Sequence, residues 1–244
     1  MDNTRLMAVV TDPGVISLQS VPLPSLKPTE VKIAVKAVTI CGSDLHVFKG
    51  KHPSVQLPIP VGHEISGEIT EIGDSVTDAK VGDRVAVEPV IVCNQCVYCK
   101  QGDYHLCTKI SFQYRQWQGG LTPFFIADQR WVHKLPEKLS YTEGALLEPL
   151  AVAVHAVRKA KIPLGGSVAI FGDGAIGLLV LQACRAAGAG DIYLAGISDH
   201  DGGHRRPHQA REGLGDLARD PAQSSGGGED DRHSGPYFRW PGRA

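Results

Sequence analysis

Apolar and polar positions alternate in short runs over the first half of the chain. Five segments combine β-branched residues with partial alternation, and proline, glycine and aspartate separate them: residues 7–10, 31–38, 67–73, 83–90 and 124–135. Alternation with a period of two is typical of half-buried strands. The pattern therefore predicts a β-rich first domain, which we assign to residues 1–150.

The pattern changes after Tyr141. Residues 143–162 are rich in alanine, valine and leucine and predict a helix with Pro149 near its start. A short apolar strand follows at residues 168–171, then a glycine-rich turn, an apolar helix ending near Gly188, and a second strand at residues 191–195. This order is a βαβ unit. We expect an α/β protein whose residues 151–201 form part of a parallel, doubly wound Rossmann domain.

The composition changes again at about residue 202. Residues 202–244 contain seven arginines and no lysine, valine, isoleucine or methionine, whereas residues 1–201 hold twelve lysines and six arginines. No period of 2 or 3.6 survives in this segment. We interpret residues 202–244 as an aberrant tail, translated from a shifted reading frame. The alternative is a disordered linker or tail.

Composition limits the kinds of partner. The 244 residues are 42% hydrophobic, and 25 basic residues balance 26 acidic ones, so no global field would attract nucleic acid or an anionic membrane. No secretory signal is visible, and no apolar run reaches the roughly 18 residues that span a bilayer. We expect a cytoplasmic protein with a small-molecule partner, in which six cysteines are metal ligands or buried thiols.

Four cysteines form one short cluster. Cys93, Cys96, Cys99 and Cys107 are spaced C-x2-C-x2-C-x7-C. Short C-x2-C spacings let sulfurs converge on one tetrahedral ion, and four thiolates leave no position for water or substrate. The spacing predicts a structural zinc site. An iron–sulfur cluster also takes four thiolates, but its usual bacterial spacing differs. Four unrelated buried cysteines are a further alternative, which the polar neighbours disfavour.

A second group of reactive side chains is divided between two segments. ICGSDLH places Cys41, Ser43, Asp44 and His46 within six positions, and VGHEISGE adds His63 and Glu64 about twenty residues later. Taken singly, Cys41 could be an ordinary buried thiol, His63 a loop histidine and Glu64 a solvated acid. They can form one site only if tertiary structure brings the two segments together.

Six motifs in a fixed order resemble the zinc-dependent medium-chain dehydrogenase/reductase family. They are ICGSDLH, VGHEISGEI, VGDRVAVEP, the four-cysteine segment, LLEPLAVAVHA and FGDGAIG, and the resemblance covers residues 1 to about 200. It implies a GroES-like catalytic domain followed by the coenzyme domain, and a homo-oligomer. It also implies two zinc ions per chain, one catalytic and one structural, with NAD or NADP as coenzyme.

The resemblance also assigns the catalytic zinc. It implies Cys41 and His63 as ligands, with Glu64 and Glu148 as carboxylates that ligate directly, exchange, or act through a water. Alcohol dehydrogenases proper have a second cysteine as third protein ligand. Here the matching region reads LLEPLAV, with Glu148 and no cysteine, which is similar to the polyol and threonine branches.

The chemistry of alcohol oxidation accounts for the other residues. A zinc ion with an open position lowers the pKa of a bound hydroxyl. Ser43 would accept a hydrogen bond from that hydroxyl, and His46 would pass the proton to solvent. We assign Asp44 to orienting a zinc ligand. We count Glu64 among the catalytic residues, together with Ser43 and His46.

The glycine-rich turn supplies Gly172, Gly174 and Gly177 as G-x-G-x-x-G after a strand and before a helix, the context of dinucleotide binding. Asp173 places a carboxylate near the expected pyrophosphate, which we cannot account for from the sequence. Gly196 falls where NAD-preferring members carry an acid for the ribose, so NAD and NADP both stay open, with Asp199 as a substitute acid. We assign Cys184 to packing.

Two functions from different classes follow. The first is oxidation of a secondary alcohol or polyol, similar to L-iditol or sorbitol, with NAD(P) as hydride acceptor. The second is a zinc-stabilised β domain without catalytic competence, a remnant of such a dehydrogenase. Zinc content and coenzyme reduction discriminate between them.

Overall fold

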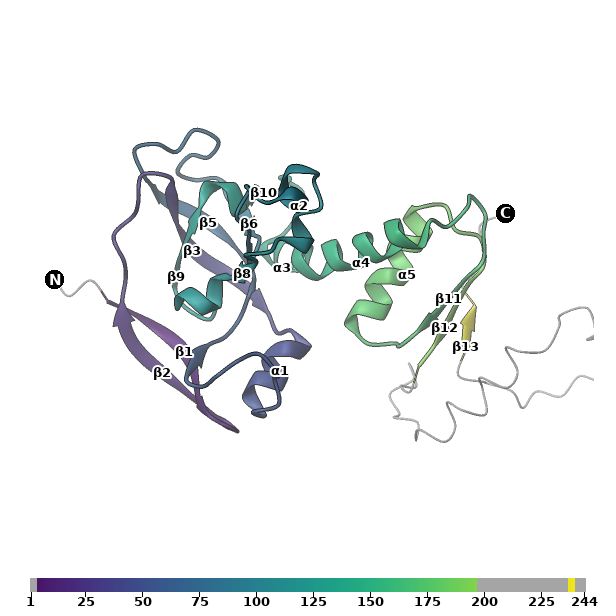
Figure 1. The fold of residues 1–244 in the computed structure, drawn as a ribbon, viewed down its shortest axis with the longest axis horizontal. Coiled ribbons are helices and arrows are strands. Elements are labelled where there is room, and N and C mark those ends of the chain that lie inside the picture. The colour runs from purple at the N-terminus through teal and green to yellow at the C-terminus, as the bar shows by residue number, and fades with distance from the viewer. Residues whose placement is uncertain (1–3, 197–236, 240–244) are drawn as a thin grey trace, which may run out of the picture. The chain divides into compact units, whose positions relative to one another are not determined.

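The computed structural model describes residues 4–196 and 237–239. The chain divides into two compact units, with the division between Glu148 and Pro149. The first unit holds the predicted strands and the second holds the βαβ unit (Figure 1). The α/β class, with a β-rich domain followed by a partial Rossmann domain, is confirmed.

The first unit is built on a five-stranded antiparallel sheet. Its strand order is β10-β6-β5-β3-β9, with bounds β3 (Glu30–Thr39), β5 (Glu64–Ile72), β6 (Arg84–Val87), β9 (Phe124–Asp128) and β10 (Val132–Lys134). Apolar side chains of these strands form the core: Val31, Ile33, Ile65, Ile69, Val85, Val87, Phe125 and Ala127. Burying each of the larger ones contributes roughly 1.5–3 kcal/mol. Their alternation with polar residues is what made the strands predictable.

Smaller sheets complete the first unit. A three-stranded sheet has the order β2-β1-β4, and a separate pair joins β7 to β8; the bounds are β1 (Thr4–Asp12), β2 (Val15–Pro22), β4 (Ile59–Pro60), β7 (Val90–Ile91) and β8 (Ser111–Phe112). Short helices lie between strands: α1 (Gly42–Phe48), α2 (Val97–Lys100), α3 (Tyr141–Ala145) and the 3-10 turns η1 (Tyr104–Leu106), η2 (Gln113–Gln116) and η3 (Gln129–Trp131).

The single strand expected at residues 124–135 is two strands separated by η3. Asp128 ends β9 because its side chain accepts hydrogen bonds from the backbone N–H of Arg130, at 3.0 Å, and from the hydroxyl of Thr29, at 2.7 Å. Side chains that bond to nearby backbone in this way favour turns. The prediction of one uninterrupted strand was wrong for this reason.

The helix expected at residues 143–162 is also divided. Ser140 and Glu143 form a capping box that starts α3, and α4 spans Leu147–Ala160. Pro149 has no N–H to bond to the carbonyl four residues earlier, that of Ala145, and its ring would clash with that carbonyl. The helix therefore ends at Ala145 and restarts, with Pro149 tolerated in the first turn of α4.

The second unit contains the predicted βαβ unit. β11 (Val168–Phe171) pairs in parallel with β12 (Ile192–Ala195), and α5 (Ala175–Ala186) connects them. Helices α4 and α5 cover one face of these strands, with a core of Ala153, Val157, Ile170, Leu181, Ala183, Cys184, Ile192 and Leu194 (Figure 1). Cys184 is 1% exposed within this core, which confirms its assignment to packing.

Little of the predicted tail is described. Residues 237–239 form β13 (Tyr237–Arg239), which pairs antiparallel to β12. The remainder of the proposed aberrant segment, residues 202–244, lies outside the described residues, and so does Asp199. No helix in the described parts of the chain is long and apolar enough to cross a membrane.

Candidate metal centres and coenzyme turn

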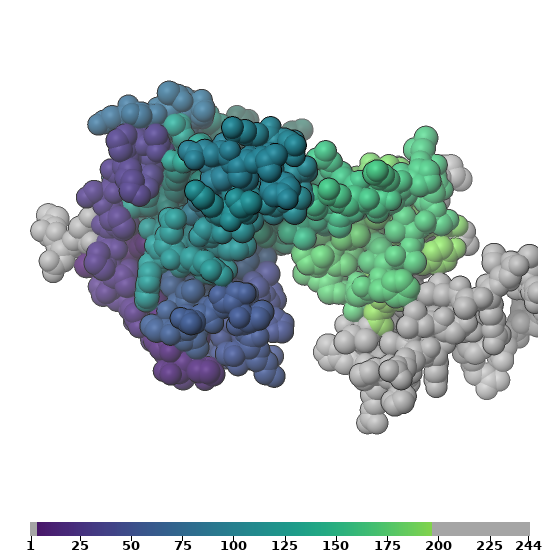
Figure 2. Space-filling model, in the orientation of Figure 1, coloured from purple at the N-terminus to yellow at the C-terminus, as the bar shows by residue number. Residues whose placement is uncertain are grey.

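The four cysteines of the short cluster converge in one lobe, residues 93–107. Atoms of this part of the sequence lie on the face of the first unit that Figure 2 shows. Their four sulfurs all lie within 4.8 Å of one another. Cys96 Sγ lies 3.5 Å and Cys93 Sγ 4.0 Å from Cys99 Sγ. Four sulfurs around one zinc ion at about 2.3 Å lie about 3.8 Å apart by tetrahedral geometry. The donor set therefore fits zinc, and three of the four cysteines are only half-buried, unlike unrelated core thiols.

Backbone N–H groups of the lobe point at the sulfurs. Those of Cys96 and Lys109 donate to Cys93 Sγ at 3.4 Å and Cys107 Sγ at 3.3 Å. Such bonds lower the pKa of Cys96 to about 6, whereas desolvation and the neighbouring sulfur raise the pKa of Cys99 to about 12. Sulfurs this close cannot all become thiolates without a cation to balance their charge.

Tertiary structure also brings together the two segments that the sequence separates. β3 ends at Thr39, and Cys41 caps the start of α1. β5 begins at Glu64 and pairs with β3, with Glu64 opposite Thr39. The Cys41 sulfur, a ring nitrogen of His63 and a carboxylate oxygen of Glu64 then lie within 4.8 Å of one another.

Asp44 joins the two segments. Its carboxylate accepts the backbone N–H of Cys41 at 3.0 Å and that of Gly62 at 3.1 Å, and it lies 3.4 Å from His63 Nδ1. Asp44 is buried, so these contacts replace the water that the carboxylate loses. One side chain thus fixes the start of α1, the loop before β5 and the orientation of the His63 ring.

The electrostatics of this cluster favour a thiolate. The hydrogen bond from His63 lowers the pKa of the Cys41 thiol, in spite of burial and with a further contribution from Ser43. Burial alone would lower the pKa of His63, but Asp44 and Cys41 outweigh it and raise that pKa to about 10. The thiolate is the form of cysteine that binds metal ions.

Two more carboxylates lie near this cluster or in it. Glu64 is 4% exposed and accepts a hydrogen bond from the Thr39 hydroxyl. Burial raises the pKa of Glu148, and the charge of Glu64 adds to that rise while His63 opposes it. Glu148 does not belong to the set of ligand atoms within 4.8 Å of one another, as far as the described residues go.

Ser43 and His46 both lie on α1, three positions apart and therefore on one face of the helix. Ser43 lines a small cavity together with Asp44, His63, His52 and Tyr114, and His46 is exposed. The sequence reasoning missed His52 and Tyr114. Only the fold brings them to the cavity, since neither stands at an informative spacing from Cys41.

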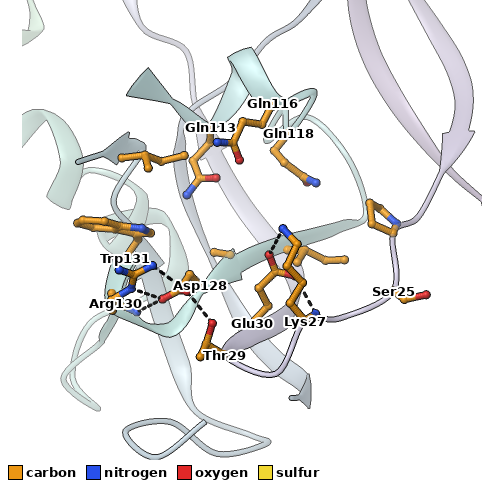
Figure 3. Close-up of a pocket in the computed structure, with 14 residues that line it drawn as sticks. Ser25, Lys27, Thr29, Glu30, Gln113, Gln116, Gln118, Asp128, Arg130 and Trp131 are labelled. Atoms are coloured by element: carbon orange, nitrogen blue, oxygen red, sulfur yellow. Dashed lines mark hydrogen bonds and ion pairs between the residues drawn. The ribbon is translucent and has the colours of Figure 1, made fainter. Parts of the chain in front are cut away.

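The larger concavity in Figure 3 belongs to another part of the first unit. Its charged side chains pair with each other: Lys27 Nζ lies 3.1 Å from Glu30 Oε1, and Arg130 Nε lies 2.8 Å from Asp128 Oδ1. Three glutamines, Gln113, Gln116 and Gln118, face them. None of the predicted site residues lines this concavity.

The glycine turn has the close backbone approach that is typical of dinucleotide-binding turns. Gly172 has a φ of 115°, which side chains rarely adopt. A Cβ on Gly177 would lie 1.8 Å from the carbonyl oxygen of Gly172, so only glycine lets α5 approach the turn. A Cβ on Gly174 would meet nothing within 4 Å, so the space beside the start of α5 is open. Helix N-termini with open approach favour phosphate.

Known proteins are similar to this chain over most of its length. Residues 27–137 match the alcohol dehydrogenase GroES-like domain. The chain is 43% identical over 189 residues to "Probable D-xylulose reductase A" from Neosartorya fischeri, covering 75% of this chain and 52% of that protein. It is 40% identical over 194 residues to sorbitol dehydrogenase from Bacillus subtilis, covering 78% and 55%.

Solved structures of dehydrogenases are also similar to this chain. Galactitol-1-phosphate dehydrogenase from Escherichia coli superposes with a TM-score of 0.75 at 31% identity, covering 85% of this chain and 58% of that one. A "short chain alcohol dehydrogenase" from Escherichia coli CFT073 in complex with NADH gives a TM-score of 0.74 at 25% identity, covering 91% of this chain and 64% of that one.

With these matches and the two cysteine-containing centres, the chain belongs to the zinc-dependent medium-chain dehydrogenase/reductase family. Within that family it is similar to dehydrogenases and reductases named for polyols and their ketoses. The chain spans about half the length of the curated relatives it matches.

Proposed function

We propose that this chain carries the metal centres and the coenzyme turn of a dehydrogenase that oxidises a secondary alcohol of a polyol. The overall reaction converts the alcohol and NAD(P)+ into the ketone, NAD(P)H and one proton. The observation that supports it most strongly is the convergence of Cys41, His63 and Glu64 around the buried carboxylate of Asp44. The names of the relatives suggest the substrate class.

Cys41, His63 and Glu64 would hold the catalytic zinc, with Glu148 as a carboxylate that ligates in exchange or through a water. The raised pKa of Glu148 suits a group that is alternately protonated and charged. When bound, zinc supplies a Lewis acid that acidifies the substrate hydroxyl. Asp44 holds His63 by Nδ1 and so keeps Nε2 as the donor atom.

The proton leaves along α1. Ser43 accepts the hydrogen bond of the substrate hydroxyl and passes the proton on, and His46, exposed on the same helix face, delivers it to solvent. His52 and Tyr114 line the same small cavity and would contact the substrate.

The structural zinc would be held by Cys93, Cys96, Cys99 and Cys107, where it fixes the shape of the lobe. The turn formed by Gly172, Gly174 and Gly177 would hold the pyrophosphate of NAD(P), whose nicotinamide accepts the hydride when bound. A cytoplasmic location and a homo-oligomer stay predictions.

The decisive experiment measures zinc and turnover on the full chain. We expect two zinc ions per chain by elemental analysis and reduction of NAD or NADP, read at 340 nm, with sorbitol, xylitol or 2,3-butanediol. Cys41→Ser should lose one zinc and all turnover, whereas Cys184→Ala, which removes a thiol from the helical core, should keep both. One zinc per chain and no turnover in the unmodified protein would contradict the proposal and indicate a zinc-stabilised β domain instead.

A further inference from the structure

Asp173 is an unexpected residue in a turn meant for a pyrophosphate. It stands between Gly172 and Gly174, where a carboxylate at the phosphate would repel the ligand. The cost depends on where the side chain points. In the structure the carboxylate lies over the end of the neighbouring strand, β12.

Two contacts define that position. The backbone N–H of Gly172 donates to the carbonyl of Ala195 at 2.7 Å, so the turn abuts the end of β12. A Cβ built on Gly196 would lie 2.0 Å from Cγ and 2.3 Å from Oδ2 of Asp173. The Asp173 carboxyl group therefore occupies the space that a side chain at position 196 would need.

Positions 173 and 196 are consequently alternatives. In the dinucleotide-binding fold an acid at the end of the second strand accepts hydrogen bonds from the ribose 2′-hydroxyl of NAD. This chain has Gly196 there, which by itself removes the acid. The same place nevertheless receives a carboxylate, delivered from the turn by Asp173.

We propose that Asp173 selects NAD(H) over NADP(H), taking the place of the acid that β12 lacks. The inference rests on the proposed dinucleotide site. A carboxylate accepts hydrogen bonds from the free 2′-hydroxyl of NAD, and it repels the 2′-phosphate of NADP, which carries nearly two negative charges at neutral pH. Gly196 makes this arrangement possible because any larger residue would displace the carboxylate.

The test uses fragments that contain the discriminating ribose but no nicotinamide: ADP-ribose and 2′-phospho-ADP-ribose. Binding of each to the full chain is measured by calorimetry at fixed salt. We expect ADP-ribose to bind at least about tenfold tighter, the effect of one charge-assisted hydrogen bond. Asp173→Asn keeps the shape of the side chain but removes the charge, and the preference should fall about tenfold. Asp191→Asn, beside the other end of β12, removes the same charge and should leave the preference unchanged.

A double variant that moves the acid from the turn to the strand gives a sharper test. Asp173→Ala combined with Gly196→Asp moves the acid to the strand and should restore the preference for ADP-ribose. Gly196→Asp alone crowds two carboxyl groups into one space and should lower the melting temperature. Equal binding of both fragments by the unmodified chain, or an unchanged preference in Asp173→Asn, would overturn the inference and leave the proposed function intact. Binding of neither fragment would overturn both, and zinc content would then be read separately.

Discussion

The two candidate metal centres are built in different ways. All four cysteines of the lobe come from residues 93–107, a segment that contains α2 and η1. The other centre takes Cys41 from the end of β3 and His63 and Glu64 from the start of β5, and it depends on the pairing of those strands and on Asp44. A locally encoded centre should fail by losing its metal and its lobe. The centre assembled from two segments should lose zinc affinity when a residue that holds its ligands in place, such as Asp44, is replaced.

The largest effect should come from breaking the local centre. Cys99→Ser removes the sulfur that is closest to two others, so we expect one of the two zinc ions to be lost and the melting temperature to fall by about 10 °C or more. Elemental analysis and thermal unfolding measure both. The matched control, Cys184→Ala, should retain two zinc ions. A Cys99→Ser protein with two zinc ions would show that the cluster is not a metal centre.

The next effect comes from removing a support of the assembled centre. Asp44→Ala leaves two N–H groups, those of Cys41 and Gly62, without their acceptor and frees the His63 ring. Each unsatisfied group costs roughly 1–3 kcal/mol, and zinc affinity at this centre should fall about 10- to 100-fold.

Zinc release during titration with a chelator measures this directly. Only the release step of the centre around Cys41 should shift, because the cysteine lobe does not involve Asp44. Asp74→Ala, a change at an exposed acid, should leave both steps in place. A shift of both steps in Asp44→Ala would mean that the centres are not independent.

The glycine turn is a second candidate site that is encoded locally. Variants of its glycines allow stability and ligand binding to be measured separately. Gly177→Ala drives a methyl group toward the Gly172 carbonyl and should destabilise the protein by about 1–3 kcal/mol. Gly174→Ala meets open space at a φ of −74°, so it should cost less than about 1 kcal/mol.

In Gly174→Ala, affinity for the coenzyme fragment and stability of the fold should respond differently. The methyl group of Gly174→Ala would occupy the approach to the start of α5, so affinity for ADP-ribose should fall although stability is kept. Chemical unfolding and calorimetry give the two quantities. Unchanged affinity in Gly174→Ala would place the pyrophosphate elsewhere.

The sequence predicts the local features better than the assembled ones, for a physical reason. The C-x2-C spacing and the G-x-G-x-x-G turn act through neighbouring backbone, so their geometry follows from short-range rules. The break before α4 also has a local cause, because Pro149 prevents α3 from continuing into α4 as one helix, although the apolar pattern hid the break. By contrast, His52, Tyr114 and the position of the Asp173 carboxylate depend on contacts between distant segments, which no spacing encodes.

The smallest effect should come from an ion pair at the surface that is part local and part assembled. Burial alone would raise the pKa of Asp128, but Arg130 and the hydroxyl of Thr29 outweigh it and lower that pKa to about 2. A carboxylate with a depressed pKa stabilises the fold above its unfolded pKa of about 3.9, and this contribution is lost as the pH falls toward 2. Because Arg130 is largely exposed, solvent screening limits the gain to about 1 kcal/mol.

Asp128→Asn should therefore lower the melting temperature by a constant few degrees between pH 7 and pH 5, and the difference should narrow as the pH falls below 4. A difference that is unchanged at pH 3 would mean that Asp128 acts through its hydrogen bonds and its charge contributes nothing.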